Sequence, residues 1–504
     1  ELDVRRQVKN HIRWSGNNEI SLQEAQMRTF SNFAWMFLQT EGDYNFSSGS
    51  RGRGNLSSTA NPYFLFPQIY NFRYNIYSSE WPVANRAIEL YLQKKSENEG
   101  WERQINGLSN NEKANLLLEK HTFKELLADV EQRNLQNNIV GLEASRLFAR
   151  SEINMGVDAF RDSLYAMLKR NTFLNIKFEN MLDTLGEMSR TDLYSYLKEW
   201  EQLTPLPFYS IGEPELTKVV NKGGEEFFVL KVLVSNNSDY DGIIQMNVLQ
   251  NGWWYQPMED PRARKKVEIA AHTSKEFVSV WEEQIRDVEI NTMVSGNLPY
   301  MIRQSIGNVK QERNKIVKDT IYTLPESSLE MPGEVIVDNE DSTLFVLSTP
   351  AVVGLLPKWL DKVEDTSFKY SGISWWRAPL QWTATTNAKY YGKYIRSAYV
   401  IKSGDGSQTA TWKIPVPEAG QYELYYHVFK DDELRWNDRL QGEYHFRVAY
   451  DSEMEDAYIN LRKANEGWEQ LGTYYFSADT VRVVLTDECK LRSVTADAVK
   501  IVKR

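Results

Sequence analysis

The sequence predicts a multidomain α + β protein with a mostly helical N-terminal region, a central immunoglobulin-like β-sandwich and a C-terminal jelly-roll-like β-sandwich. Three observations support this class. The length of 504 residues exceeds the roughly 100–200 residues of one domain. The apolar pattern has a helical period up to Pro207 and a period of two beyond it. The later strand-like runs follow one another without helical inserts, as is typical of sandwiches.

The helical part is predicted over residues 81–207, after a mixed segment, residues 1–80, with a loop rich in Gly, Ser and Asn. Ser109 and Glu112 have the spacing of a capping box, which marks a helix start. Apolar side chains recur every three or four residues and predict three buried helix faces. These faces comprise Leu116, Leu117, His121, Phe123 and Leu127; Phe160, Leu164, Met167 and Leu168; and Leu193, Tyr196, Leu197 and Trp200.

The strand-rich part is predicted to contain two sandwiches. β-branched and aromatic runs bounded by Asn, Asp and Gly turns predict the immunoglobulin-like sandwich over residues 208–300. The charged stretch within 301–332 is expected to be a short helix or connector. Residues 333–504 contain a regular series of strands, several with strict alternation, and a jelly roll is the architecture this favours.

Composition excludes several functions. The formal net charge of −10 leaves no basic surface for a nucleic-acid backbone. No run reaches the ~18 apolar residues that a membrane-spanning helix needs. The N-terminus lacks the apolar core of a signal peptide, so we expect that the signal of an exported form lies upstream or has been removed. A single cysteine excludes an intrachain disulfide.

The C-terminal third carries several short signatures in one order. They are Asp338-Asn339-Glu340-Asp341, Tyr391-Gly392 before Arg396-Ser397-Ala398, Ala410-Thr411-Trp412, Gly420 with Tyr422, Gly467-Trp468 with Leu471-Gly472, and Ala496-Asp497-Ala498-Val499. In these signatures the segment is similar to the golvesin and xanthan-lyase-type carbohydrate-binding-like domain. The resemblance covers about 333–504 and implies a β-sandwich of secreted or cell-surface proteins, often appended to enzymes. It implies no particular ligand.

A second resemblance covers about 140–212. Gly156 and Phe160, followed by Trp200 and Leu206-Pro207, resemble the helical segment that follows the zinc site of membrane-alanyl-type aminopeptidases. The HExxH signature of that family is missing, because no histidine has a partner four residues on. Two histidines on adjacent helical turns are needed to bind one zinc ion. We therefore expect this chain to be non-catalytic.

Aromatic side chains in expected loops are the candidates for ligand binding. Sugar rings stack their C–H faces on flat side chains, while their hydroxyls bind polar groups. Trp375-Trp376, Tyr390-Tyr391 and Trp436-Asn437-Asp438 combine both kinds of side chain. Trp412, Tyr422 and Trp468 are instead expected in the core. The predicted ligand-binding residues are Trp376, Tyr390, Tyr391, Trp436 and Asp438.

Metal binding has weaker candidates. Asp338, Glu340 and Asp341 are either calcium ligands or a structural turn whose carboxylates accept backbone amides. His427 and His445 lie on strands expected to be neighbours, and a sheet histidine without metal is the simpler interpretation. No other cofactor is predicted.

The functional hypothesis is a non-catalytic C-terminal portion of an exported bacterial cell-surface protein, whose carbohydrate-binding-like module serves glycan contact or adhesion. We expect an extracytoplasmic location. One alternative is the C-terminal part of a zinc aminopeptidase whose metal domain lies upstream. Another is a structural or assembly subunit at the bacterial surface, with a protein partner.

Overall fold

In the computed structural model the chain forms two compact units, of which the first combines Glu1–Glu97 with Glu143–Lys198 and the second combines Asn98–Leu142 with Glu199–Arg504. The predicted helical domain 81–207 therefore contributes helices to both units. The structure describes residues 8–9, 21–29, 74–92, 99–171, 174–220, 223–249, 260–307, 309–313, 318–327, 329, 333–348, 368–373, 378–430, 442–451 and 453–504.

The first unit is built on helices packed through aromatic side chains. Tyr91, Phe148 and Phe160 are buried, and the ring centroid of Phe148 lies 4.8 Å from that of Tyr91 and 5.4 Å from that of Phe160. The faces predicted around Phe160 and Leu193 are confirmed. The elements are β1 (Tyr74–Tyr77), α3 (Ala84–Leu92), α7 (Gln136–Met155) from Glu143 onward, α8 (Val157–Arg170), β2 (Leu174–Lys177), α9 (Phe178–Ser189) and α10 (Leu193–Lys198).

The second unit begins with α4 (Glu99–Asn106) and α5 (Asn110–Leu118). The predicted capping box is confirmed, since the amide of Glu112 donates to Ser109 Oγ and the amide of Ser109 donates to Glu112 Oε2. The single buried face from Leu116 to Leu127 is wrong, because α5 ends and a second capping box at Thr122 starts α6 (Phe123–Ala128). His121 is exposed in the intervening turn.

Two sheets enclose a common core in the central part of the chain. Leu230 and Phe277 of one sheet pack with Ile244 and Ile290 of the other. The first sheet has the order β10 (Met301–Ser305), β9 (Asp287–Asn291), β6 (Gly242–Leu249), β7 (Arg264–Ile269). The second has the order β11 (Val309–Arg313), β4 (Glu215–Val220), β5 (Glu226–Asn236), β8 (Thr273–Trp281), β12 (Thr320–Pro325), with β3 (Tyr209–Ile211) also on β5. We call this pair of sheets the central sandwich.

The connector predicted over residues 301–332 is wrong, because three strands of the central sandwich lie there. The charged strand β11 pairs in parallel with β4 at the sheet edge. Lys310 is exposed there and its Nζ lies 3.1 Å from Glu215 Oε2. An edge strand tolerates such charges, which also discourage pairing with other chains. A charged sequence is therefore not by itself evidence for a connector.

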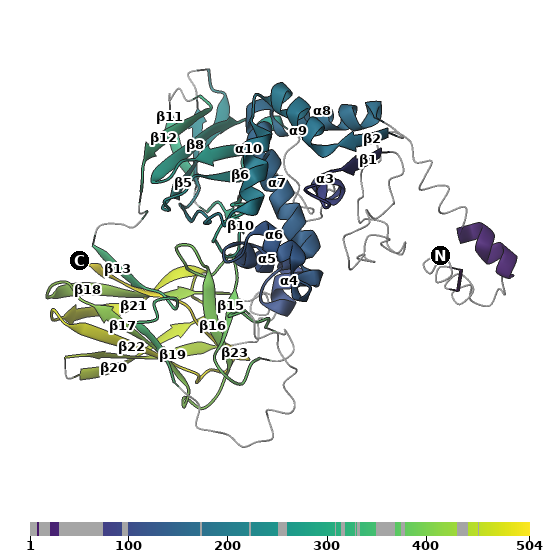
Figure 1. Cartoon of the computed structure of the whole chain (residues 1–504). Coiled ribbons are helices and arrows are strands. Elements are labelled where there is room, and N and C mark those ends of the chain that lie inside the picture. Colours follow the sequence, from purple (N-terminus) through teal and green to yellow (C-terminus); the bar gives the residue numbers. More distant parts are fainter. Residues whose placement is uncertain are drawn as a thin grey trace. The chain divides into compact units, whose positions relative to one another are not determined.

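The C-terminal sandwich occupies most of the green-to-yellow part of Figure 1. Trp412 and Tyr422 are buried in its core, as predicted. One sheet has the order β13 (Glu334–Val337), β24 (Val499–Lys503), β18 (Gly420–Val428), β21 (Gly467–Phe476). Another has the order β14 (Phe345–Leu347), β17 (Thr409–Pro415), β22 (Thr480–Thr486), β19 (Glu443–Tyr450), β20 (Glu453–Asn460), and a third comprises β15 (Thr383–Thr386), β16 (Ser397–Lys402) and β23 (Ser493–Ala496).

The helical N-terminal part and the two regions of packed sheets confirm the multidomain α and β class. The immunoglobulin-like and jelly-roll topologies stay predictions. None of the described helices has both the length and the apolar character needed to span a membrane.

Candidate functional site

The predicted ligand-binding residues differ in where they lie. Trp376, Trp436 and Asp438 lie outside the described residues. Tyr390 is buried, and its ring packs against Phe429 with centroids 4.7 Å apart, so it presents no open face. Tyr391, directly after it, is half-buried. One tyrosine of the pair is thus near the surface, although the pair lies in the loop between β15 and β16 and not in a strand.

Strand alternation in β18 builds a second set of aromatic side chains next to Tyr391. Tyr422, Leu424 and Tyr426 point into the core, so Tyr425 and His427 point outward. On β24 the core residues Val499 and Ile501 place Lys500 on the outer side, where it pairs with Tyr425 in the register. On β21, Trp468 is the register partner of His427.

These side chains form a contiguous cluster. The ring of Trp468 lies 5.0 Å from that of Tyr391 and 5.1 Å from that of His427, centroid to centroid. Lys500 Nζ lies 4.8 Å from the centroid of Trp468 and 5.4 Å from that of Tyr425, within the range of cation–π attraction. We call Tyr391, Tyr425, His427, Trp468 and Lys500 the aromatic face.

A buried carboxylate holds one end of the aromatic face. Asp497 Oδ2 lies 2.9 Å from His427 Nδ1, and both Asp497 oxygens lie 3.2 Å from the amide nitrogen of Tyr391, which donates to them. Burial raises the pKa of Asp497, and the charge and hydrogen bond of His427 oppose that rise. The bond through Nδ1 leaves Nε2 of His427 as the nitrogen that can meet a ligand.

The charge of Lys500 is balanced within the fold. Its Nζ lies 2.9 Å from Glu334 Oε1, and both side chains are nearly buried. An ion pair this little exposed is costly to break from one side only, because the remaining charge stays desolvated. Lys500 is therefore fixed under the rings of Trp468 and Tyr425.

The acidic segment proposed for calcium forms a hydrogen-bonded turn. The amide of Asp338 donates to Asp341 Oδ2 at 2.9 Å. Glu340 accepts from Lys369 Nζ at 2.5 Å, from the Tyr370 hydroxyl and from Ser397 Oγ. Among the described residues no group of three His, Cys, Asp or Glu side chains is arranged to hold a metal ion. The contacts match the structural-turn alternative, and calcium stays an untested prediction.

Two sequence interpretations need correction. Trp468 was expected in the core, but it is half-buried on the outer side of β21. His427 and His445 are on strands of different sheets, so they do not form a pair. His445 instead lies 2.9 Å from Asp456 and stacks on Tyr458.

Comparisons with known proteins identify the C-terminal sandwich. Residues 376–503 match the model of the Golvesin C-terminal domain, which confirms the golvesin-type resemblance of this part. No curated protein matches the chain. The resemblance of about 140–212 to zinc aminopeptidases stays a prediction.

Three solved structures show weak similarity. A Paenibacillus xanthan lyase has 17% sequence identity and a TM-score of 0.24, and the match covers 60% of this chain and 27% of the lyase. A calcium binding mutant of Bacteroides uniformis beta-glucuronidase 2 has 11% identity and a TM-score of 0.17, with 62% of this chain and 32% of the enzyme covered. The structure of Sulfolobus Turreted Icosahedral Virus has 9% identity and a TM-score of 0.12, with 59% of this chain and 92% of the viral chain covered. This chain spans about a third or less of the two enzymes. At such low TM-scores these similarities carry no argument about function.

Proposed function

We propose that residues 333–504 are a carbohydrate-binding-like module that contacts glycans through the aromatic face, within a non-catalytic portion of an exported bacterial cell-surface protein. The golvesin-type match supports an extracellular surface module. The observation that carries the proposal is the clustering of His427 and Trp468, on neighbouring strands of one sheet, with Tyr391 from the loop before β16; their ring centroids lie 5.0–5.8 Å apart.

The chemistry of the aromatic face suits a sugar ring. Trp468 and Tyr391 offer flat apolar surfaces for C–H stacking, and the half-buried His427 offers one nitrogen to a hydroxyl. Asp497 and Lys500 hold neighbouring side chains in place, so less conformational entropy is lost when a ligand binds. Adhesion and the location outside the cytoplasm are parts of the same proposal.

The test is glycan binding by the full chain and by three alanine variants. A glycan panel would first identify a ligand, and calorimetry would then measure its Kd. We expect Trp468→Ala and Tyr391→Ala to weaken binding by about tenfold or more, because each removes a stacking surface. Tyr458→Ala is the matched control, since this exposed tyrosine belongs to β20 in another sheet.

Two results would contradict the proposal. Equal losses in all three variants would show that the aromatic face has no special role. Absence of binding across a broad panel of bacterial and host glycans would remove the glycan function and favour the structural or assembly alternative. Circular dichroism and thermal melting of each variant would exclude unfolding as the cause of a loss.

A further inference from the structure

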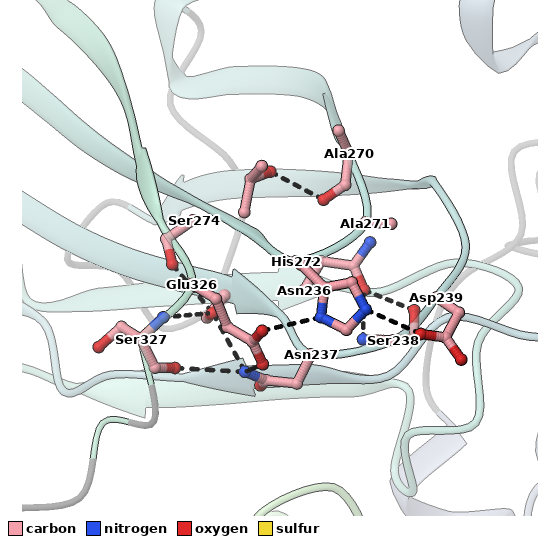
Figure 2. Close-up of polar contacts among 12 residues, drawn as sticks. Asn236, Asn237, Ser238, Asp239, Ala270, Ala271, His272, Ser274, Glu326 and Ser327 are labelled. Carbon is pink, nitrogen blue, oxygen red and sulfur yellow. Dashed lines mark hydrogen bonds and ion pairs between the residues drawn. The ribbon is translucent and has the colours of Figure 1, made fainter.

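Two turns of the central sandwich and the segment that follows β12 meet at His272 (Figure 2). His272 lies between β7 and β8 with a φ of 52°, the left-handed conformation. Asp239 belongs to the turn between β5 and β6. Glu326 directly follows β12, where the chain leaves the central sandwich on its way to β13.

The distances select the protonated imidazole. His272 Nδ1 lies 2.8 Å from Glu326 Oε2, and His272 Nε2 lies 2.8 Å from Asp239 Oδ1. A neutral imidazole has one N–H, so one nitrogen would turn a lone pair toward a carboxylate. Only the imidazolium donates both hydrogen bonds. The hydrogen bonds to Asp239 and then to Glu326 raise the pKa of His272 accordingly.

The same contacts hold the segment that leaves β12. Asn237 Nδ2 donates to Glu326 Oε1 at 2.8 Å and to the Ser327 carbonyl at 3.3 Å. The Ser327 amide donates to Ser235 Oγ at 3.1 Å. Without the His272 contact, Glu326 Oε1 would still accept from Asn237. Glu326 Oε2, however, would lose His272, which is its donor among the contacts drawn in Figure 2.

Other charged groups around this cluster do not replace His272. Asp241 accepts from the Ala271 amide at 2.8 Å and so fixes the turn that carries His272. Lys393 lowers the pKa of Glu326, after the larger effects of Asn237 and His272. Because its pKa is lowered, the Glu326 carboxylate is ionised where His272 titrates, so the loss of their contact follows the loss of the proton from His272.

We propose that His272 is a pH-sensitive clip that ties the segment Glu326–Ser327 to the central sandwich when protonated and releases it when neutral. The contribution of a histidine with a raised pKa is fully present below its unfolded-state pKa and is lost as pH rises through its folded-state pKa. The clip therefore opens as the pH rises above the folded-state pKa of His272.

The experiment measures amide hydrogen exchange of the full chain at about pH 5 and about pH 8.5, on either side of histidine titration. Dividing by intrinsic rates removes the direct effect of pH on exchange. We expect the protection factor of the Ser327 amide to fall roughly two- to fivefold at the higher pH, because an exposed ion pair has a modest free energy. Nitrogen shifts of the His272 ring would report its titration in the same samples.

Two variants and a control make the test specific. His272→Asn retains a residue type that tolerates the left-handed backbone, so it should fold and abolish the pH-dependent fall. Asp239→Asn should shift the midpoint of the fall to lower pH. His121→Asn, at an exposed histidine between α5 and α6, should behave like the wild type. Equal protection of Ser327 at both pH values, or an undiminished fall in His272→Asn, would overturn the proposal.

Discussion

Individual side chains in the C-terminal sandwich show how burial changes acid–base behaviour. Asp338 is half-buried at the end of β13, and burial raises its pKa well above the ordinary value of aspartate, with the negative charge of Asp497 adding to the rise. A carboxyl group whose pKa is raised by folding binds its proton more tightly in the native state. Its ionised form therefore reduces stability at neutral pH.

Replacing Asp338 by Asn should raise the thermal midpoint at pH 8. The asparagine retains an oxygen for the Asn339 amide but removes repulsion from Asp497. The gain should shrink as the pH falls through the raised folded-state pKa of Asp338 toward the unfolded-state pKa of about 3.9. At low pH the folded aspartate is protonated and uncharged, as the asparagine is at every pH. Differential scanning fluorimetry over a pH series measures it. Asp341→Asn, in the same turn but exposed, is the control, and a gain independent of pH would contradict the electrostatic explanation.

At the scale of elements, local signals located helix starts better than helix lengths. The Ser109 capping box was evident from two residues, because both of its hydrogen bonds are made within one turn. The end of α5 at Leu118 was missed, since the apolar spacing continues through Thr122 into α6. The strand β11 was missed because its charged sequence becomes a strand only through pairing with β4.

Ser109→Ala should lower the free energy of unfolding by about 1 kcal/mol, because the Glu112 amide loses its acceptor at a buried helix start. Urea denaturation followed by helical circular dichroism is the measurement. Ser109→Thr keeps the hydroxyl and should retain most of the stability. A threonine variant as unstable as the alanine variant would indicate a packing effect instead of lost capping.

At the scale of the whole molecule, the first unit combines segments that are separated in sequence. Tyr91 comes from the first segment, and Phe148 and Phe160 come from the second. The core of this unit therefore forms only when both segments meet. The core of the C-terminal sandwich, around Trp412, belongs to the other unit.

Core truncations should consequently affect different calorimetric transitions. Phe160→Ala removes a buried ring and should destabilise the first unit by about 3–5 kcal/mol, and Trp412→Ala should do the same to the second. Scanning calorimetry of the full chain should show Phe160→Ala lowering one transition and Trp412→Ala another. A single transition lowered equally by both variants would show that the two units unfold as one.

The sequence by itself determined the multidomain class, the capping box, the core positions of Trp412 and Tyr422 and the golvesin-type resemblance. These properties depend on periodicity and on short motifs, which neighbouring residues specify. Of the candidate site, it indicated Tyr391 as a ligand-binding residue. Only the tertiary structure decided which face of β21 carries Trp468, that Asp497 meets His427, and that β11 belongs to a sheet. Those outcomes depend on pairing between distant strands, which no local pattern encodes.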